Sequence, residues 1–559
     1  MKRSLLPELL ILLGAAVLRF GFALLPLDLL AMLLEDDAWM VAAIARHWAI
    51  GNRITADGVN PTNGFHPLYP LTLGALPYLA VPTAALEHLQ AGFRVNLLIC
   101  AALSTLTLLP FYAMLRHAAP RPLALAGLAL LAFNPLLIQV SVNAMETSLA
   151  LLLLVTLWWQ LLTRPAPELS LVQAAGLGGL AGLTILARLD NALAVAYLGL
   201  WLVWQELRAR QWPIRSVTFG GVAGLVLLPY FARNWLIFES LSPSSGRALA
   251  YMHSYSGSFT YTSGLQLLAY PPALDLTTAP QWMLALGILG LAGMYLTLPR
   301  AQRGMFTPLV LYSLTLALYY GYVQQQGRPR YYVTVAFVIV LLVCAWLAAR
   351  LATRPQAIRL VPVGAAAVVA VLIGYNSLMW VRSTVATINA PYQAQPAMFA
   401  AARWMSANLP EDAVIAAQNS GIFQYYSNRL VINIDGKLNH EIVPILEQRQ
   451  LDRYLHARGV EYVVDLPSVA GYIEFYSASL SDARPHRELS ALEKLGIHAR
   501  RFAARIGIGA PVVLPERVPE RVIVPFSDVS QIVQEFPLPN DPTQAVTIYL
   551  LLPQFGATP

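Results

Sequence analysis

The residues best suited to do chemistry stand together near the N-terminus. Glu35, Asp36 and Asp37 follow a long apolar stretch, and the chain continues as AWMVAAIARHWAIG, a predicted helix with almost no polar face. Such a helix is expected to lie in the membrane interface and to hold the carboxylates partly out of water. A carboxylate held in this way is suited to act as a general base. The simpler interpretation is that the acids only end and solvate the preceding helix.

The next segment, DGVNPTNGFHPLYP, brings hydrogen-bonding groups close to these acids. Its glycines and prolines predict a rigid loop, on which Asn60, Asn63 and His66 are candidate substrate ligands or braces. A tight connector without function is the alternative. Ionisable groups at membrane depth are costly and are candidate functional groups. Those that interrupt or flank the apolar segments farther along are Arg94, Glu146, Arg188, Asp190, Arg233, Arg328 and Arg330.

The segment QQQGRPRYY allows two interpretations. Arg328, Arg330 and Tyr331 could anchor a span as part of an aromatic belt. They could equally clamp a phosphate, for which the guanidinium fork is well suited. The residues alone do not separate the two. Arg188 and Asp190 in ARLDN are predicted to pair with each other and to brace the site.

The elements that must position these residues are membrane spans. Of 559 residues, 57% are hydrophobic and 12% are charged, with a mean hydropathy of +0.55, whereas soluble domains carry about 25% charged residues. The apolar segment 68–88 holds three prolines and is predicted not to cross. We predict eleven spans of roughly 20 residues, near 8–33, 93–115, 122–142, 147–163, 171–188, 191–207, 216–236, 281–299, 306–323, 331–349 and 360–381.

The loop arginines predict the orientation. If 68–88 does not cross, the arginine-containing loops between spans all lie on one side of the membrane. The positive-inside rule assigns that side to the cytoplasm. These arginines are Arg116, Arg121, Arg164, Arg208, Arg210, Arg215, Arg300, Arg303, Arg350, Arg354 and Arg359. The first outer loop, 34–92, and everything after 382 then face outward. We expect a multi-pass protein of a bacterial cytoplasmic membrane.

The chain changes character after the last span. Residues 1–384 are predicted to form the transmembrane catalytic domain, and residues 385–559 an extracytoplasmic α/β domain. In the second part, a helical pattern over 397–409 precedes β-branched runs at 413–417, 429–434 and 459–466, with another helix near 440–457. Asn419, Tyr425, Tyr426 and Asp435 are weaker, exposed-looking candidates there.

Composition also limits the partners. The net charge of +7 comes from basic residues in short loops, so nucleic acid is not an expected partner. The two cysteines lie in apolar stretches and are predicted to be buried. No spacing of Cys and His suggests a zinc site.

These motifs resemble the GT-C glycosyltransferases, a superfamily that includes protein O-mannosyltransferases, bacterial aminoarabinose transferases and mycobacterial arabinofuranosyltransferases. The resemblance rests on DDAW after the first span, NPTNGFHPLYP in the same loop, and AMETS, LARLD and GRPRYY farther along. It covers the whole membrane part and implies a GT-C fold with interfacial helices in the first outer loop. It also implies transfer of a sugar from a polyprenyl-phosphate donor to a hydroxyl group of a cell-envelope glycan, lipid or protein, with inversion.

The resemblance also implies roles for individual residues. Asp36 takes the place of the catalytic base with Asp37 beside it, although Asp replaces the Glu that many relatives have second, so the division between the two stays open. His66 matches the His of a His-Pro-Pro-Leu element, here with one Pro. The residues implied near the donor phosphate are His66, Arg94, Arg328, Arg330 and Tyr331. No cofactor is implied as necessary; a divalent cation is compatible with the pattern but not indicated.

Two other functions remain as alternatives. A transporter or flippase of lipid-linked or polar substrates usually has internal repeats and broken helices around a midplane site, and the sequence has no repeat of fixed period. A scaffold with a degenerate site would not need the intact acids or the outward arginines.

Overall fold

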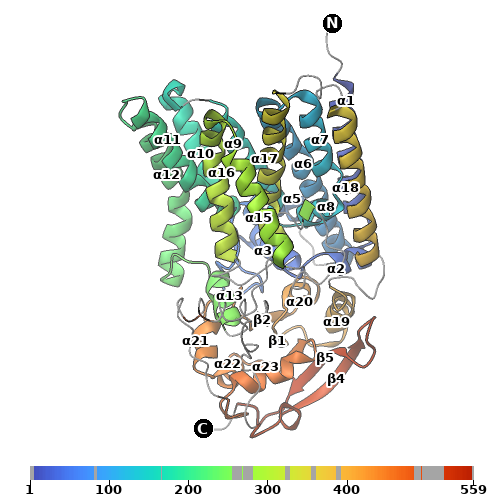
Figure 1. The fold of residues 1–559 in the computed structure, drawn as a ribbon. Coiled ribbons are helices and arrows are strands. Elements are labelled where there is room, and N and C mark those ends of the chain that lie inside the picture. The colour runs from blue at the N-terminus through green and yellow to red at the C-terminus, as the bar shows by residue number, and fades with distance from the viewer. Residues whose placement is uncertain are drawn as a thin grey trace.

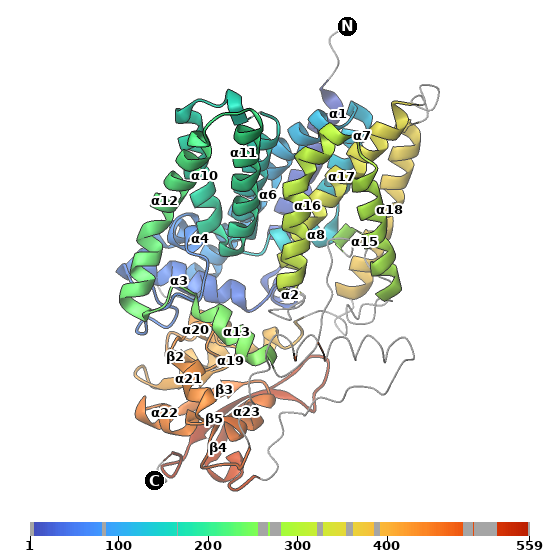
Figure 2. The same ribbon diagram turned by 60° about the vertical axis from the view of Figure 1, so that its left-hand side comes forward.

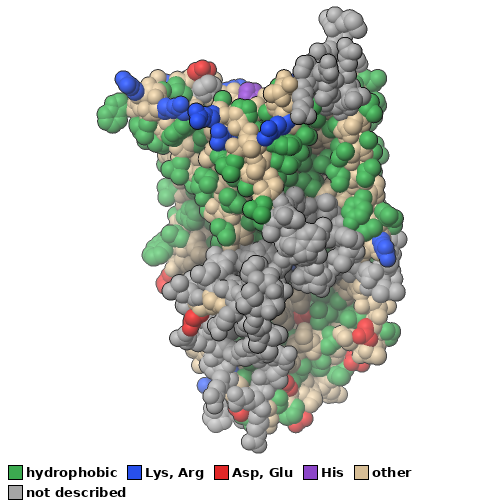
Figure 3. All heavy atoms as spheres, in the orientation of Figure 1, with side chains coloured by type: hydrophobic (Ala, Val, Ile, Leu, Met, Phe, Trp, Pro, Cys, Tyr) green, Lys and Arg blue, Asp and Glu red, His purple; other side chains and the backbone are tan. Residues whose placement is uncertain are grey.

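The computed structural model describes residues 5–80, 85–164, 166–254, 267–268, 281–320, 328–353, 361–384, 392–483, 493, 496 and 522–556. A helical bundle forms one half of the molecule and a mixed α/β domain the other (Figure 1). Helix α1 (Leu6–Ala23) begins on the face of the bundle away from that domain. Lysine and arginine side chains gather along this same distal face (Figure 3).

Helices cover all eleven predicted spans, because each apolar stretch must satisfy its backbone hydrogen bonds internally. They are α1 (Leu6–Ala23) with α2 (Leu27–Leu33), α6 (Leu86–Ala118), α7 (Arg121–Ala132) with α8 (Pro135–Ser141), α9 (Thr147–Leu162), α10 (Leu171–Ala187), α11 (Ala192–Arg208), α12 (Ile214–Phe238), α15 (Gln281–Leu296), α16 (Arg300–Leu318), α17 (Val333–Leu351) and α18 (Val361–Thr384). Residues 321–323 and 360 of the predicted spans lie outside the described residues.

Length and apolar composition support a polytopic membrane protein. Within the described ranges, five helices are long and apolar enough to cross a membrane, or six if α7 and α8, which meet at 61°, form one span. The bend follows from Pro135 at the start of α8, where the Asn134 side chain accepts a hydrogen bond from the Leu137 N–H at 3.1 Å.

The first outer loop lies between the bundle and the α/β domain (Figure 2). Its main element is α3 (Asp37–Gly51), at the place of the predicted interfacial helix. The segment predicted not to cross forms α4 (Leu68–Leu71), η1 (Leu73–Ala75) and α5 (Leu76–Ala80), and residues 81–84 lie outside the described part. None of these three pieces is long enough to span a bilayer.

Other short elements border the same region. They are η3 (Leu189–Asn191) between α10 and α11, α13 (Ser244–Ser254) after α12, and η5 (Pro329–Tyr332) before α17. The 3₁₀ turn η2 (Ala166–Glu168) joins α9 and α10.

The C-terminal domain is a five-stranded mixed sheet with strand order β2-β1-β3-β5-β4. The strands β1 (Val414–Ala417), β2 (Leu430–Asn433) and β3 (Tyr462–Asp465) are parallel, whereas β4 (Ser530–Pro537) and β5 (Ala545–Leu551) pair antiparallel. The helices are α19 (Gln395–Asn408), α20 (Gly421–Tyr426), α21 (Ile442–Glu447), α22 (Leu451–Ala457) and α23 (Ser468–Tyr476), and η7 (Phe526–Asp528) precedes β4. The predicted α/β alternation is therefore confirmed, while residues 385–391 at the predicted domain boundary lie outside the described part.

The domain docks on the membrane part through α20. Tyr425 is fully buried, its hydroxyl donates to the Leu89 carbonyl at 2.7 Å, and it lies 2.8 Å from the Tyr78 hydroxyl. Beside it, the rings of Trp39 and Phe93 stack with centroids 4.9 Å apart. The expectation that Tyr425, Tyr426 and Asp435 are exposed is wrong, because all three are buried. They belong to the packing between the domains and within them.

Candidate functional site

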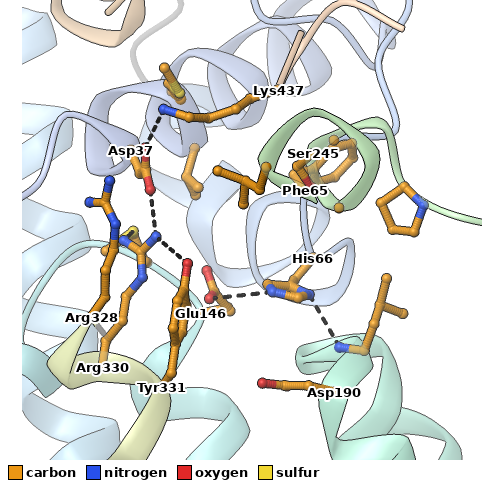
Figure 4. A pocket seen from close by; sticks show the side chains of 18 of the residues that line it. Asp37, Phe65, His66, Glu146, Asp190, Ser245, Arg328, Arg330, Tyr331 and Lys437 are labelled. Carbon is orange, nitrogen blue, oxygen red and sulfur yellow. Dashed lines mark hydrogen bonds and ion pairs between the residues drawn. The ribbon is translucent and has the colours of Figure 1, made fainter. Parts of the chain in front are cut away.

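A cavity of about 400 Å³ lies where the first outer loop, the ends of several spans and the C-terminal domain meet. The N-terminal half of α3 forms one wall, and η3, α13 and η5 form others. The C-terminal domain reaches in with the segment after β2. The ionisable side chains that line it include Asp37, His66, Glu146, Asp190, Arg328, Arg330 and Lys437 (Figure 4).

The acidic triplet and the two outward arginines form one ion-pair network. Glu35 pairs with Arg328 at 2.7 Å and also with Arg330. Arg330 in turn pairs with Asp37. Arg330 is 8% exposed, yet its Nε has no hydrogen-bond partner in the described part of the chain. A buried guanidinium with one unused donor can accept a further anionic ligand.

Asp37 is the member of the triplet that faces the cavity. Its carboxylate lies between Arg330 and Lys437, whose Nζ is 3.8 Å away. Burial alone would raise the pKa of Asp37, but Arg330, Lys437 and Arg328 hold it well below its usual range. Lys437 also pairs with Asp435 at 3.0 Å, and these acids raise the pKa of Lys437. Both groups are therefore charged at neutral pH.

Asp36 faces the C-terminal domain and not the cavity. Its two carboxylate oxygens accept hydrogen bonds from the backbone N–H groups of Gly421 and Ile422, both at 2.9 Å, at the start of α20. Burial raises the pKa of Asp36 to about 7, against the effect of these two donors. Neighbouring residues at the start of a helix point about 100° apart, and here Asp37 lines the cavity while Asp36 binds α20.

His66 and two acids form the opposite wall. His66 Nδ1 accepts a hydrogen bond from the Leu189 backbone N–H at 3.2 Å, and its Nε2 lies 3.9 Å from Glu146 (Figure 4). Burial lowers the pKa of His66, so the ring is neutral at pH 7. Arg188 pairs with Glu146 at 3.4 Å and with Asp190 at 2.8 Å, which confirms the predicted pairing of Arg188 with Asp190. Although burial alone would raise it, Arg188 lowers the pKa of Asp190 to about 2.

Two stacked tyrosines contact both the ion-pair network around Arg330 and the group around Arg188. The rings of Tyr320 and Tyr331 lie 4.2 Å apart at 11°. Arg188 and Arg330 both lie over the Tyr331 ring, at 5.3 Å and 5.2 Å from its centroid. Tyr320 donates to Asp190 at 2.5 Å. Tyr331 therefore holds both guanidinium groups by cation–π contact, and Tyr320 stacks on its ring.

Besides Asp36 and Arg188, four other predicted site residues do not line the cavity. Arg94 donates to the carbonyls of Ala23 and Leu25, the latter at 2.7 Å, and so closes the C-terminal end of α1. Asn60 bonds Asp57 within its own loop at 2.7 Å. The remaining two hold the loop in place: Asn63 accepts from the Ser244 N–H at 3.0 Å, and Arg233 donates to the Thr62 carbonyl at 3.3 Å.

Sequence reasoning misses three residues of the site. The position of Glu35 suggests only a helix-end role, although it stands in the acidic triplet. Tyr320 lies near the end of a predicted span without any motif around it. Lys437 lies 400 residues from Asp37, and no local pattern links the two.

A metal site was not predicted. No group of three or more His, Cys, Asp or Glu side chains that could hold a metal ion occurs in the described ranges. The positive charge that borders the cavity comes from Arg328, Arg330 and Lys437.

Comparison with solved structures identifies the fold. The oligosaccharyltransferase AglB from Archaeoglobus fulgidus, in complex with an inhibitory peptide and a dolichol-phosphate, superposes with a TM-score of 0.53 at 13% identity, covering 84% of this chain and 70% of that one. ArnT from Cupriavidus metallidurans, bound to undecaprenyl phosphate, gives 0.52 at 12% identity and covers 98% of both chains. The protein thus has the GT-C fold, as the sequence predicts.

Sequence comparisons add less. Residues 385–505 match a family described as "Domain of unknown function (DUF8728)". No curated protein matches the chain.

Proposed function

We propose that this protein is an integral-membrane glycosyltransferase that moves a sugar from a polyprenyl-phosphate donor to a hydroxyl group of a glycan, lipid or protein. The observation that carries the proposal is the cavity in which Asp37 faces Arg328, Arg330 and Lys437. A base for the acceptor and positive charge for a departing phosphate are the two requirements of this reaction. The lipid phosphates bound to AglB and ArnT support such a donor.

Asp37, and not Asp36, is the base in this proposal. A general base must come within hydrogen-bond reach of the proton that it takes, and Asp37 lines the cavity. Asp36 does not line the cavity, and its carboxylate accepts from the backbone N–H groups at the start of α20. We assign Asp36 to positioning: it fixes the start of α3 and, with it, the direction of Asp37.

Donor binding would also activate Asp37. Without substrate, Arg330 and Lys437 lower its pKa and make it a weak base. A phosphate that enters the cavity competes for these same cations. Asp37 then loses part of its ion pairing, and its pKa rises toward a value suited to proton transfer.

The transfer is a single displacement. The acceptor oxygen forms a bond to the anomeric carbon as its proton passes to Asp37, and the bond between that carbon and the phosphate oxygen breaks. The polyprenyl phosphate leaves with the electron pair, and the guanidinium and ammonium groups stabilise its charge. Direct attack inverts the anomeric configuration. Since the lipid leaves with its own phosphate, the step does not require a metal.

The other wall would hold the sugar. Glu146, Asp190 and the neutral His66 offer hydrogen-bond acceptors and a donor to hydroxyl groups. Arg188 keeps both acids in place. We further propose a bacterial cytoplasmic membrane with the cavity on its outer face, because the arginine-rich distal face satisfies the positive-inside preference (Figure 3).

Proteoliposomes loaded with polyprenyl-phosphate sugars and supplied with candidate acceptors test the proposal. We expect a new glycosidic product and free polyprenyl phosphate in equal amounts. If the labelled sugar or lipid crosses the bilayer and no glycosidic product forms, the protein is a transporter and the proposal is wrong.

A further inference from the structure

A second cavity, which we call the interdomain cleft, opens where the C-terminal end of α3 meets the C-terminal domain. It has a volume of about 620 Å³ and is lined mainly by Arg46, His47, Asp57, Glu411, Gln424 and Arg429. It shares no lining residue with the cavity around Asp37. Its size is within the range of ligand sites, about 300–1,000 Å³.

The cleft carries polar atoms whose hydrogen-bonding capacity is unused. Gln424 is 4% exposed, and its Oε1 has no partner in the described part of the chain. The same holds, among these residues, for Nε of Arg46 and Nε of Arg429. Buried polar groups in folded proteins are almost always paired. Three unpaired buried atoms border one cleft, so part of the hydrogen-bonding capacity of its lining residues is unused in the described structure.

The two arginines of the cleft lack carboxylate partners within the described ranges. Arg46 makes no ion pair or hydrogen bond there, although it is half-buried and burial lowers its pKa. Arg429 donates only to backbone carbonyls, among them Leu409 at 2.7 Å. Asp57 accepts from its own loop, through the N–H groups of Val59 at 2.9 Å and Asn60 at 2.8 Å. The free guanidinium capacity is suited to an anionic group.

The rest of the lining selects the kind of anion. Apart from Leu430, every side chain that lines the cleft is polar or charged, so a lipid tail or an apolar peptide would find no surface to bury. Glu411 and Gln424 offer oxygen acceptors beside the guanidinium groups. A ligand with many hydroxyl groups and some carboxylates matches this mixture.

We infer that the interdomain cleft binds an acidic saccharide, a stretch of the acceptor glycan that carries carboxylate groups. Arg46 and Asp37 lie nine residues apart on α3, about 14 Å along the helix axis. An acceptor chain held in the cleft would therefore be close to the cavity in which its end is glycosylated. This assignment of the acceptor class rests on the proposed function.

Direct binding tests the inference without any donor. A tetrasaccharide of uronic acids is titrated into the full-length protein in nanodiscs, with a neutral glucose tetrasaccharide of equal length as comparison. We expect the uronate to bind about tenfold or more tightly than the neutral chain, and Arg46→Gln to lose about tenfold or more in uronate affinity. Arg453→Gln, which removes an exposed arginine of α22, a helix that contributes no residue to the cleft, should bind like the wild type.

Two further measurements separate the binding of the uronate from an effect on folding. Because Arg46 has no partner in the described structure, Arg46→Gln should not lower the melting temperature. Asn428→Asp, which adds a negative charge at an exposed position of the cleft, should weaken uronate binding through charge repulsion in an intact fold. Unchanged uronate affinity in both variants would overturn the inference. Binding of inorganic phosphate, but not of the uronate, would identify a simple anion site and would also overturn it.

The outcome is separable from that of the proposed function. If Arg46→Gln binds uronate normally while glycosyl transfer is observed, only the acceptor assignment fails. If the uronate binds through Arg46 and no donor supports transfer, the assignment of the cleft as a saccharide site is retained and the proposed function fails.

Discussion

At the scale of residues, three consecutive acids have three different roles. Glu35 holds Arg328 and Arg330, Asp36 binds the start of α20, and Asp37 faces the cavity. The difference follows from direction: successive residues entering a helix point to different sides. One acid organises the cations, one docks the second domain, and one is left to meet a substrate.

The depressed pKa of Asp37 predicts the pH dependence of the reaction. Its carboxylate is ionised above its folded-state pKa, so lowering the pH from about 8 to about 5 should not protonate it in the free enzyme. We expect kcat/KM to stay within about threefold over this range. Burial raises the pKa of Asp36, the neighbour of Asp37, to about 7, so the profile is also measured in Asp36→Asn. An acid limb near pH 6 that persists in that variant would contradict the account.

The sequence predicts where this group of acids lies, but it does not predict which acid has which role. Polarity and the apolar helix that follows placed Glu35, Asp36 and Asp37 at the membrane surface. Which acid faces the cavity depends on the rotation of α3 about its axis. The contact with α20, which lies 385 residues away in the sequence, sets that rotation. The role of Arg94 was not predictable for the same reason. An arginine at a span end can bind a ligand or close a neighbouring helix, and which of the two it does depends on the packing of the helices.

At the scale of elements, two glycines let the C-terminal domain approach the first outer loop. A Cβ on Gly421 would lie 2.8 Å from both carboxylate oxygens of Asp36. A Cβ on Gly64 would overlap the carbonyl oxygen of Lys437, which also accepts from the Ser244 hydroxyl at 2.9 Å. Contacts this close require backbone without side chains on one partner. The two contacts hold Asp36 and Lys437 in their positions.

Alanine substitutions test these contacts. Gly421→Ala and Gly64→Ala should each destabilise the docked domain by about 1–3 kcal/mol, because backbone or the Asp36 carboxylate must move. Thermal unfolding in detergent, followed by the exposure of buried tyrosines, measures this. Gly471→Ala is the matched control on α23: its Cβ meets open space, so stability should stay equal or rise. Equal melting temperatures for all three variants would refute the proposed close docking.

The helices themselves were predictable, since long apolar runs specify spans without knowledge of their neighbours. The parallel strands of the C-terminal domain were also visible as β-branched runs. The contacts between this domain and the membrane part could not be predicted, because the sequence does not distinguish a buried tyrosine such as Tyr425 from an exposed one.

At the scale of the whole molecule, the cavity is built by both domains. Lys437 comes from the segment after β2 and completes the positive charge around Asp37. The membrane part alone would lack this cation. The C-terminal domain is therefore part of the site in this account and not only an appendage.

Removing the charge of Lys437 should weaken donor binding. In Lys437→Met we expect the KM for the polyprenyl-phosphate sugar to rise about 10- to 100-fold, as for the loss of one charge-assisted contact to phosphate. Lys437→Arg should retain most of the affinity. Initial rates at varied donor concentration give both constants. A normal donor KM in the methionine variant would mean that Lys437 does not contact the phosphate.

The orientation is tested in intact cells. A cysteine at Ser527, exposed beside β4, should react with a membrane-impermeant thiol reagent. A cysteine at Ala209, exposed on the distal face, should react only after lysis. The native Cys100 and Cys344 are buried and should remain silent. The reverse pattern would invert the orientation and place the cavity in the cytoplasm.

The central claim is that Asp37 is the acid that meets the acceptor. Its most direct test is the single-turnover rate of sugar transfer from a polyprenyl-phosphate donor, measured for Asp37→Asn and Asp36→Asn in the same membranes. We predict that Asp37→Asn lowers the rate of the folded fraction by about 10²–10⁴-fold, in addition to the stability lost with its ion pairs to Arg330 and Lys437. Asp36→Asn should lower the melting temperature and leave the rate of the folded fraction within about tenfold. A normal rate in Asp37→Asn, with the loss found in a fully folded Asp36→Asn, would contradict the account.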